Sequence, residues 1–290
     1  MSQQTQLTVE KNYRFSGALR PFSLFIALST TGIVFARLQD QPNFSLGLAW
    51  LVVLGAALAQ VGVNLINDWS ERHQFPKASA QYRNINLNFR IACLCFGVAI
   101  GIGLLIATVR GFAIILMAGI GLIACLGYTL EPLNLKRRGL GLVVVFLVMG
   151  PLLMVGSAYA MTGEWRADVL IDALIFSPLI SLVLLANELR DYERDKFTPD
   201  QTFTVRVGFK PARYCFLSLT LATALAYLAA ILKTHLQPTL IFILPLTLAI
   251  WIVVFCIRSE QAELFKLPPL TGRLVLATGT AHIFALLGTI

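Results

Sequence analysis

Long apolar segments separated by short polar connections run along the chain from residue 18 to residue 290. A helix needs about 20 apolar residues to cross roughly 30 Å of hydrocarbon, and nine segments come close to or exceed this length. They comprise residues 18–36, 44–66, 88–109, 111–130, 139–161, 168–187, 212–232, 236–257 and 272–290. They are too long, and alternate too little, for the strands of a β-barrel. The pattern therefore predicts an all-α multi-pass membrane protein with nine transmembrane helices in a bundle.

Composition agrees with this prediction. Of the 290 residues, 57% are hydrophobic and only 13% are charged, with a mean hydropathy of +0.75. So apolar a chain is not intrinsically disordered, and a soluble enzyme with such a surface is improbable. The net charge of +8 comes from basic residues that lie between the apolar segments. We therefore expect the lipid bilayer, and no nucleic acid, as the partner of these bases.

The distribution of Lys and Arg predicts the orientation. With nine spans the connections alternate between the two sides, and nineteen of the 23 basic residues fall on the side of the N-terminus. The positive-inside rule makes that side cytoplasmic, so the N-terminus is expected inside and the C-terminus outside. The predicted organisation is a cytoplasmic segment, 1–17, followed by a nine-helix membrane domain, 18–290. The expected location is the cell (inner) membrane.

Two of the cytoplasmic connections begin with a polar helical stripe. Residues three and four apart share one face of a helix. The first stripe contains Asn64, Asn67, Asp68 and Glu71, and the second contains Asn187, Asp191 and Asp195 with Glu188 beside it. The stripes end the second and sixth spans, in the two halves of the chain. This is a weak sign of an internal repeat that places a site between two halves.

These stripes suggest a metal site. Carboxylates at a membrane boundary are costly unless they are solvated, paired or bound to a metal. Two facing sets of oxygen ligands, without His or Cys, suit Mg²⁺, which completes its octahedron with water and phosphate oxygens. The alternative is a pair of helix ends solvated by the cytosol. Arg190 inside the second stripe, Lys136 on the same side and Arg20 at the start of the first span could clamp a phosphate, unless they only set the topology.

The same residues carry a resemblance to a known family. The two acidic stripes resemble the aspartate-rich motifs of the UbiA superfamily of membrane prenyltransferases, and the resemblance extends over most of the chain. It is clearest in residues 67–71 (NDWSE), 128–141 (YTLEPLNLKRRGLG), 187–195 (NELRDYERD) and 202–208 (TFTVRVG). The 128–141 run, and the 187–195 motif together with the 202–208 stretch that follows it, look most like the branch that prenylates 1,4-dihydroxy-2-naphthoate in menaquinone and phylloquinone synthesis.

The resemblance implies a reaction and a set of roles. Mg²⁺ ions held by the two motifs bind the diphosphate of a prenyl donor, and an aromatic acceptor attacks the allylic cation left when diphosphate departs. Carried over by position, the metal ligands would be Asp68, Glu71, Asp191 and Asp195, which with Lys136 form the catalytic set. Substrate binding would fall to Asn64, Asn67, Asn187, Arg190, Arg20 and Tyr128. The apolar spans would supply a groove for the prenyl tail, open sideways to lipid.

Three positions depart from the family pattern. Glu71 replaces the middle Asp of the first motif, Phe75 stands where a third acid is usual, and Asp200 stands where the naphthoate branch has Lys. Glu keeps an oxygen ligand, whereas Phe75 cannot bind a metal, so the first cluster should hold Mg²⁺ more weakly.

Three hypotheses remain open. The chain is a prenyltransferase acting on naphthoate or a related ring. Alternatively, it uses another acceptor, such as a hydroxybenzoate, homogentisate or a specialised metabolite, or it is a degenerate homologue. A membrane transporter is the hypothesis from a different class, and the clustering of the acids at helix ends disfavours it.

Overall fold

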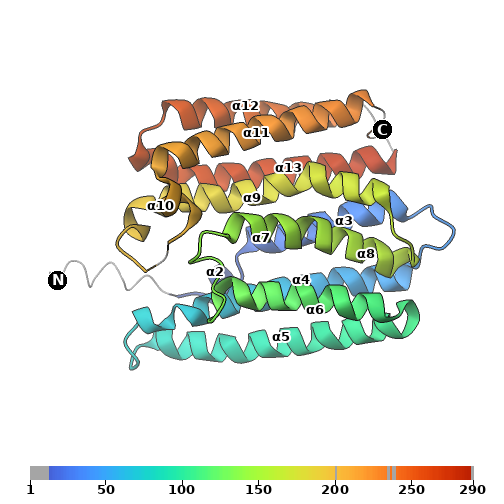
Figure 1. The fold of residues 1–290 in the computed structure, drawn as a ribbon, viewed down its shortest axis with the longest axis horizontal. Coiled ribbons are helices and arrows are strands. Elements are labelled where there is room, and N and C mark those ends of the chain that lie inside the picture. The colour runs from blue at the N-terminus through green and yellow to red at the C-terminus, as the bar shows by residue number, and fades with distance from the viewer. Residues whose placement is uncertain (1–12, 200, 234–235, 237–239, 289–290) are drawn as a thin grey trace.

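A computed structural model describes residues 13–199, 201–233, 236 and 240–288 of the chain. Within these residues the fold is a bundle of roughly parallel and antiparallel helices (Figure 1). Nine of the helical segments are long and apolar enough to cross a membrane, which confirms the predicted fold class for the described part of the chain. The spans are α3 (Pro21–Leu38), α4 (Leu46–Ser70), α5 (Ala80–Arg110), α6 (Phe112–Thr129), α7 to α8 (Gly141–Thr162), α9 (Ala167–Asp195), α11 (Phe209–Leu232), η3 with α12 (Leu240–Arg258) and η4 with α13 (Glu263–Leu287).

Three short helices lie outside the spans: α2 (Phe15–Ala18) precedes the first span, and η1 (Arg72–Gln74) and α10 (Phe203–Val207) lie in connections. In the last two spans, η3 (Leu240–Phe242) leads into α12 (Ile243–Arg258), and η4 (Gln261–Lys266) leads into α13 (Leu267–Leu287). Each predicted span corresponds to one observed span, but several helices are longer than their apolar segments. α5 begins at Ala80 instead of residue 88, and α9 continues to Asp195 instead of ending at 187. Hydropathy detects only the part of a helix that matches the hydrocarbon thickness, whereas the backbone ladder continues through polar turns.

The fifth span contains an irregularity that the sequence marks with a proline. α7 (Gly141–Leu147) continues into a π-helical turn, η2 (Val148–Leu152), before α8 (Leu153–Thr162) completes the crossing. Pro151 has no N–H to donate, and a π-bulge absorbs that loss without ending the helix. The preceding residue, Gly150, packs so closely on α9 that a Cβ there would overlap Ser177 Oγ. This close contact sets the distance between the fifth span and α9.

α9 and α13 are the most buried spans, and α6 and α12 are the least buried. Large side chains such as Phe176 of α9 and Phe216 of α11 are fully buried between the helices. Apolar side chains on the outside of the bundle, such as Leu94 of α5 and Phe112 of α6, are exposed. An apolar outer surface of this kind matches the acyl chains of a bilayer.

The C-terminal ends of α4, α6 and α9 meet at one end of the bundle, which we call the motif end (Figure 1). The helices run in alternating directions, so both polar stripes of the sequence reach this end although they lie in different halves of the chain. That the motif end faces the cytoplasm remains a prediction from the basic residues.

The opposite end of the bundle contains a buried polar network. Arg37 of α3 donates from Nε and Nη2 to the two carboxylate oxygens of Asp172 of α9, at 2.7 Å each. His282 Nε2 of α13 lies 3.1 Å from Asp172 Oδ1, and its Nδ1 lies 3.0 Å from the hydroxyl of Tyr227 of α11. Asp172 and His282 have no exposed surface. The network therefore ties four spans together away from the motifs.

Candidate functional site

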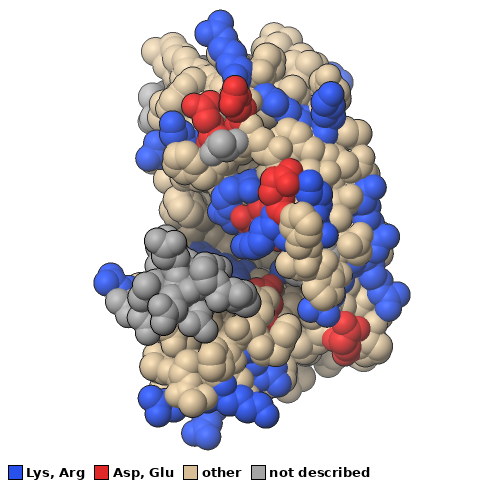
Figure 2. Space-filling view, turned by 90° about the vertical axis from the view of Figure 1, so that its left-hand side faces the viewer, with Lys and Arg blue, Asp and Glu red and all other residues tan. Residues whose placement is uncertain are grey.

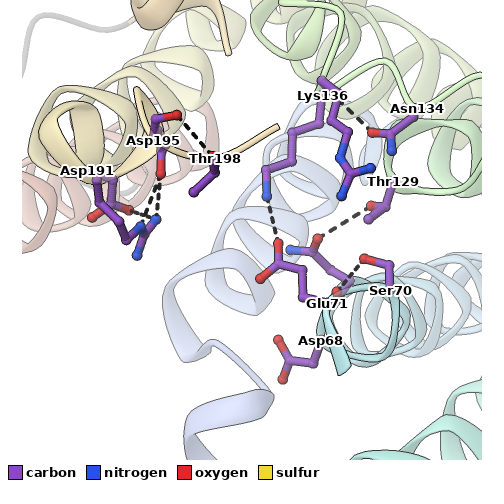
Figure 3. A network of polar contacts seen from close by, with 12 residues as sticks. Asp68, Ser70, Glu71, Thr129, Asn134, Lys136, Asp191, Asp195 and Thr198 are labelled. Atoms are coloured by element: carbon purple, nitrogen blue, oxygen red, sulfur yellow. Dashed lines mark hydrogen bonds and ion pairs between the residues drawn. The ribbon is translucent and has the colours of Figure 1, made fainter. Parts of the chain in front are cut away.

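Basic and acidic side chains surround a central depression at the motif end (Figure 2). The first motif reaches it on the last turns of α4 and the second on the last turn of α9. Between them lies the connection from α6 to α7, which carries Lys136 (Figure 3). In the close view, Asp191 and Asp195 lie on one side, and Asp68 and Glu71 on the other.

Asp68 pairs with Arg20, the residue before α3. Arg20 Nη2 donates to Asp68 Oδ1 at 2.8 Å. The backbone of Arg20 has φ of 46°, a left-handed conformation that is uncommon for a residue with a side chain. Asn64 supports this turn, because its amide nitrogen donates to the Leu19 carbonyl and to Ser23 Oγ, both at 2.8 Å. The buried Asn64 thus positions Arg20 and does not itself face the acids.

Tyr13 is a site residue that the sequence gave no reason to select. Its hydroxyl donates to Asp68 Oδ2 at 3.0 Å and accepts a hydrogen bond from Asn88 Nδ2 of α5 at 3.0 Å. Burial, with a smaller contribution from the neighbouring Asp68, raises the pKa of Tyr13 to about 12. The hydroxyl therefore stays protonated at neutral pH and remains a donor to Asp68. An isolated Tyr in a polar N-terminal segment carries no periodic or motif signal that could have identified it.

Glu71 pairs with Lys136. The ammonium group of Lys136 lies 2.8 Å from Glu71 Oε1 (Figure 3). The backbone of the connection folds back on α6, with Lys136 N donating to the Tyr128 carbonyl at 2.9 Å. Lys136 is also close enough to Asp195 and Glu188 to interact with them electrostatically. It is the base that lies between the two motifs.

Asn67 lies near the end of α4 and Tyr128 near the end of α6. The Asn67 amide lies beside Arg20 and Thr129, and we assign its oxygen to the Arg20 side because there it accepts from the guanidinium, with Nη2 at 2.9 Å. Tyr128 lies against the start of α7, where a Cβ on Gly141 would stand 3.5 Å from the Tyr128 hydroxyl. The structure thus brings Asn67 to the Arg20–Asp68 pair and places the Tyr128 side chain against the start of α7.

Two arginines of α9 pair with the acids of the second motif. Arg190 donates to both oxygens of Asp191, at 2.8 and 2.7 Å. Arg194 Nη2 lies 3.1 Å from Asp191 Oδ2 and 2.9 Å from Asp195 Oδ1. Asn187 instead donates to the Val183 carbonyl of its own helix at 2.8 Å, so in this structure it does not join the acids.

Glu188 of the same helix has a structural role that the sequence did not single out. It is buried, and its Oε2 accepts a hydrogen bond from the backbone N–H of Thr204 at 2.9 Å. Thr204 belongs to α10, which forms from the 202–208 motif. This bond holds α10 against the end of α9. Asp200, the position that departs from the naphthoate branch, lies outside the described residues.

Each of the four motif carboxylates is neutralised by a base within the protein. Among the residues that the structure describes, no three His, Cys, Asp or Glu side chains lie close enough together to hold a metal ion. The ion pairs are Asp68–Arg20, Glu71–Lys136, Asp191–Arg190 and Asp195–Arg194. Mg²⁺ usually takes one or two protein carboxylates and completes its shell with water and phosphate oxygens, so this oxygen-only donor set fits the ion.

Two cavities adjoin the site. One, of about 340 Å³, is polar and lies between the end of α4 and the 129–137 connection, with Glu71, Arg72 and Lys136 in its wall. The other, of about 400 Å³, is apolar and is lined by α3 to α6, the π-helical turn and α8, with Ala56 and Gln60 of α4 in its wall. Gln60 donates to Asn64 Oδ1 at 3.1 Å, and Val63 also lines the apolar cavity, so the cavity reaches the turn of α4 that carries Asn64.

A polytopic helical bundle with paired acids and bases at one end, beside an apolar cavity, has the features that the resemblance to membrane prenyltransferases predicts. Residues 26–265 match the family model of the UbiA prenyltransferase family, and the chain belongs to that family. This confirms the resemblance found in the sequence motifs.

Individual relatives agree. The chain is 24% identical over 241 residues to UbiA prenyltransferase domain-containing protein 1 of Dictyostelium discoideum, covering 76% of this chain and 71% of that protein. It is 28% identical over 198 residues to the 1,4-dihydroxy-2-naphthoate octaprenyltransferase of Mycobacterium leprae, covering 64% and 66%. The corresponding enzyme of Escherichia coli is 24% identical over 225 residues, covering 72% and 73%.

Solved structures share the fold. A UbiA homologue of Aeropyrum pernix superposes with a TM-score of 0.67 at 17% identity, covering 92% of this chain and 98% of that one. A UbiA homologue of Archaeoglobus fulgidus bound to GPP and Mg²⁺ superposes with a TM-score of 0.56 at 15% identity, covering 95% and 99%.

Proposed function

We propose that this protein transfers an isoprenyl group, within the membrane, from a prenyl diphosphate to an aromatic acceptor, namely 1,4-dihydroxy-2-naphthoate or a related ring. One observation carries the proposal. The two carboxylate stripes and the four bases paired with them lie at one end of an apolar cavity. Relatives that carry the name 1,4-dihydroxy-2-naphthoate octaprenyltransferase support this acceptor. The family neighbour bound to GPP and Mg²⁺ supports the donor and the cofactor.

The residues divide into two sets by charge. Asp68, Glu71, Asp191 and Asp195 would hold Mg²⁺, which when bound neutralises the charge that develops on the departing diphosphate. Arg20, Lys136 and Arg190 are the donors available to the diphosphate oxygens, since each contacts a motif carboxylate from a different element. Tyr13 and Asn64 hold Asp68 and Arg20 in place before substrate binds. Asn67, Asn187 and Tyr128 complete the proposed substrate-binding set.

The apolar cavity would receive the prenyl tail. Its wall comes almost wholly from aliphatic and small side chains, so it excludes water from the space next to the diphosphate. The polar cavity beside Glu71 and Lys136 is of a size to accept an aromatic ring. The tail and the acceptor would therefore approach the Glu71–Lys136 pair from different directions.

Membership of the UbiA family favours the transferase over the transporter alternative. Another acceptor, such as a hydroxybenzoate or homogentisate, remains the second candidate because Glu71 and Phe75 depart from the usual first motif. We further propose that the protein resides in the inner cell membrane with its N-terminus and motif end in the cytoplasm, as the basic residues indicate. Residues 18–290 would form the membrane domain.

The purified protein in detergent, given Mg²⁺, octaprenyl diphosphate and 1,4-dihydroxy-2-naphthoate, is expected to form prenylated naphthoate, measured by liquid chromatography. A chelator in excess of Mg²⁺ should stop the reaction. Product with hydroxybenzoate or homogentisate alone would overturn the naphthoate assignment. If no aromatic acceptor gives product, the chain is a degenerate homologue and the enzymatic proposal is wrong.

Replacement of Ala56 by Phe should shorten the prenyl chain that the enzyme accepts. Ala56 lies two turns from Asn64, or about 12 Å along α4, in the wall of the apolar cavity. We expect kcat/KM for octaprenyl diphosphate to fall roughly tenfold and that for geranyl diphosphate to change less than about twofold. Leu54→Phe is the matched control, because Leu54 is half-exposed on the outside of α4. An equal loss for both donors would show that this cavity does not hold the tail.

A further inference from the structure

Arg194 occupies the space between the two carboxylates of the second motif. Asp191, Arg194 and Asp195 share the last turn of α9, so their side chains can meet on one face. Arg194 Nη2 lies within hydrogen-bond distance of both acids, 3.1 Å from Asp191 Oδ2 and 2.9 Å from Asp195 Oδ1. Arg194 Nε lies 3.1 Å from Asp195 Oδ1 as well. One positively charged group thus bridges the pair.

The exposed fractions of the three side chains show which of them can move away from the other two. The side chains of Asp191 and Asp195 are 20% and 10% exposed, whereas that of Arg194 is 69% exposed. Two partly buried negative charges at the C-terminal end of a helix repel each other and the helix dipole, so they need a cation nearby. Arg194 supplies that cation from the solvent side and can rotate away without disrupting packing.

The two guanidinium groups at the second motif also limit metal binding there. Arg190 already donates to both oxygens of Asp191, and Arg194 adds a third contact to that carboxylate. A divalent cation held by both Asp191 and Asp195 would share these carboxylates with Arg194. It would also bring two positive charges next to the guanidinium, and their mutual repulsion favours a conformation in which Arg194 has moved away.

We propose that Arg194 is a built-in counter-ion of the second motif, which competes with a divalent cation for Asp191 and Asp195. The proposal rests on the proposed function, in that it takes these two acids as metal ligands. Arg194 must leave the pair before the cation is bound, so the protein binds a divalent cation more weakly than its carboxylates alone would. The released guanidinium is then close enough to meet an anionic group that arrives with the cation.

The test is a titration of the purified full-length protein with Mn²⁺, followed by the electron paramagnetic resonance signal of free Mn²⁺ in the absence of substrate. Arg194→Gln is expected to tighten Mn²⁺ binding by about three- to tenfold, the range that loss of a partly exposed charge-assisted contact allows. Arg194→Lys, which keeps the charge, should stay near the wild type. Size-exclusion chromatography verifies that each variant is folded, and Arg194→Ala serves as the second neutral variant.

Lys196→Gln is the matched control. It removes the same charge from the same end of α9, but Lys196 pairs with the exposed Glu193 at 2.8 Å and not with the motif acids. Equal tightening in Arg194→Gln and Lys196→Gln, or no tightening in either, would overturn the competition.

The variant Asp191→Asn distinguishes failure of the proposed competition by Arg194 from failure of the proposed function. If wild-type binding is unaffected by Asp191→Asn, these acids are not the metal site and both proposals fall. If Asp191→Asn abolishes binding while Arg194→Gln leaves it unchanged, only the role of Arg194 is wrong. Binding seen in Arg194→Gln and absent from the wild type would be its strongest support.

Discussion

Substitution of Asp191 by Asn is expected to lower the rate of prenyl transfer at saturating Mg²⁺ by at least about a hundredfold, as loss of a main electrostatic group in an active site does. The amide has the shape of the carboxylate and can still accept a hydrogen bond from Arg190, so the fold should survive. It lacks the negative charge that the proposed metal site requires. Initial rates of product formation with octaprenyl diphosphate and naphthoate measure the effect.

Glu193→Gln provides the control for this experiment. Glu193 lies on the same turn of α9, but it is exposed and contacts Lys196 and Gln261 instead of the motif side chains. Its loss should leave the rate within about twofold of the wild type, because exposed ion pairs contribute little. A rate for Asp191→Asn equal to that of Glu193→Gln would remove Asp191 from the proposed site.

Asp172→Asn should have the largest effect on stability. The carboxylate of Asp172 is fully buried and receives both Arg37 and His282. Neutralising it removes the carboxylate that the Arg37 guanidinium contacts through Nε and Nη2 inside the bundle, and breaking a buried ion pair typically costs about 3–5 kcal/mol. We expect a clear drop in the thermal denaturation midpoint in detergent, with the specific activity of the remaining folded protein unchanged, since the network lies at the end opposite the motifs.

Two further variants make this stability prediction specific. Asp168→Asn, one turn earlier on α9, breaks the more exposed pair with Arg166 and should cost less than about 1 kcal/mol. The double variant Arg37→Gln with Asp172→Asn removes both charges and should be more stable than Asp172→Asn alone. If Asp172→Asn unfolds at the same temperature as Asp168→Asn, the buried network is not what holds these spans together.

Hydropathy predicted the number of spans in the described part of the chain, because a bilayer contains no water to satisfy backbone polar groups. It could not predict that α5 starts at Ala80 or that α9 runs to Asp195. In polar turns hydropathy carries no signal that separates a continuing helix from a loop, and only the spacing of the acids indicated a helix there. This matters for the site, since the second motif lies on the part of α9 that hydropathy missed.

The motif spacing predicted that the acids share helix faces and that bases stand near them. It did not predict which base meets which acid. The pairs Arg20–Asp68 and Lys136–Glu71 join residues far apart in the chain, and they depend on how three spans cross. Tyr13 and the Arg37–Asp172–His282 network are invisible in the sequence for the same reason.

The sequence by itself determined that this is a membrane bundle with two acid-bearing helix ends, because helical periodicity and the thickness of a bilayer are local constraints that each segment obeys alone. The tertiary structure decided which charges from different spans touch and where the apolar cavity lies. Those features depend on side-chain rotamers and helix crossings, and in a site where every acid has a base within reach, only the fold selects the partner.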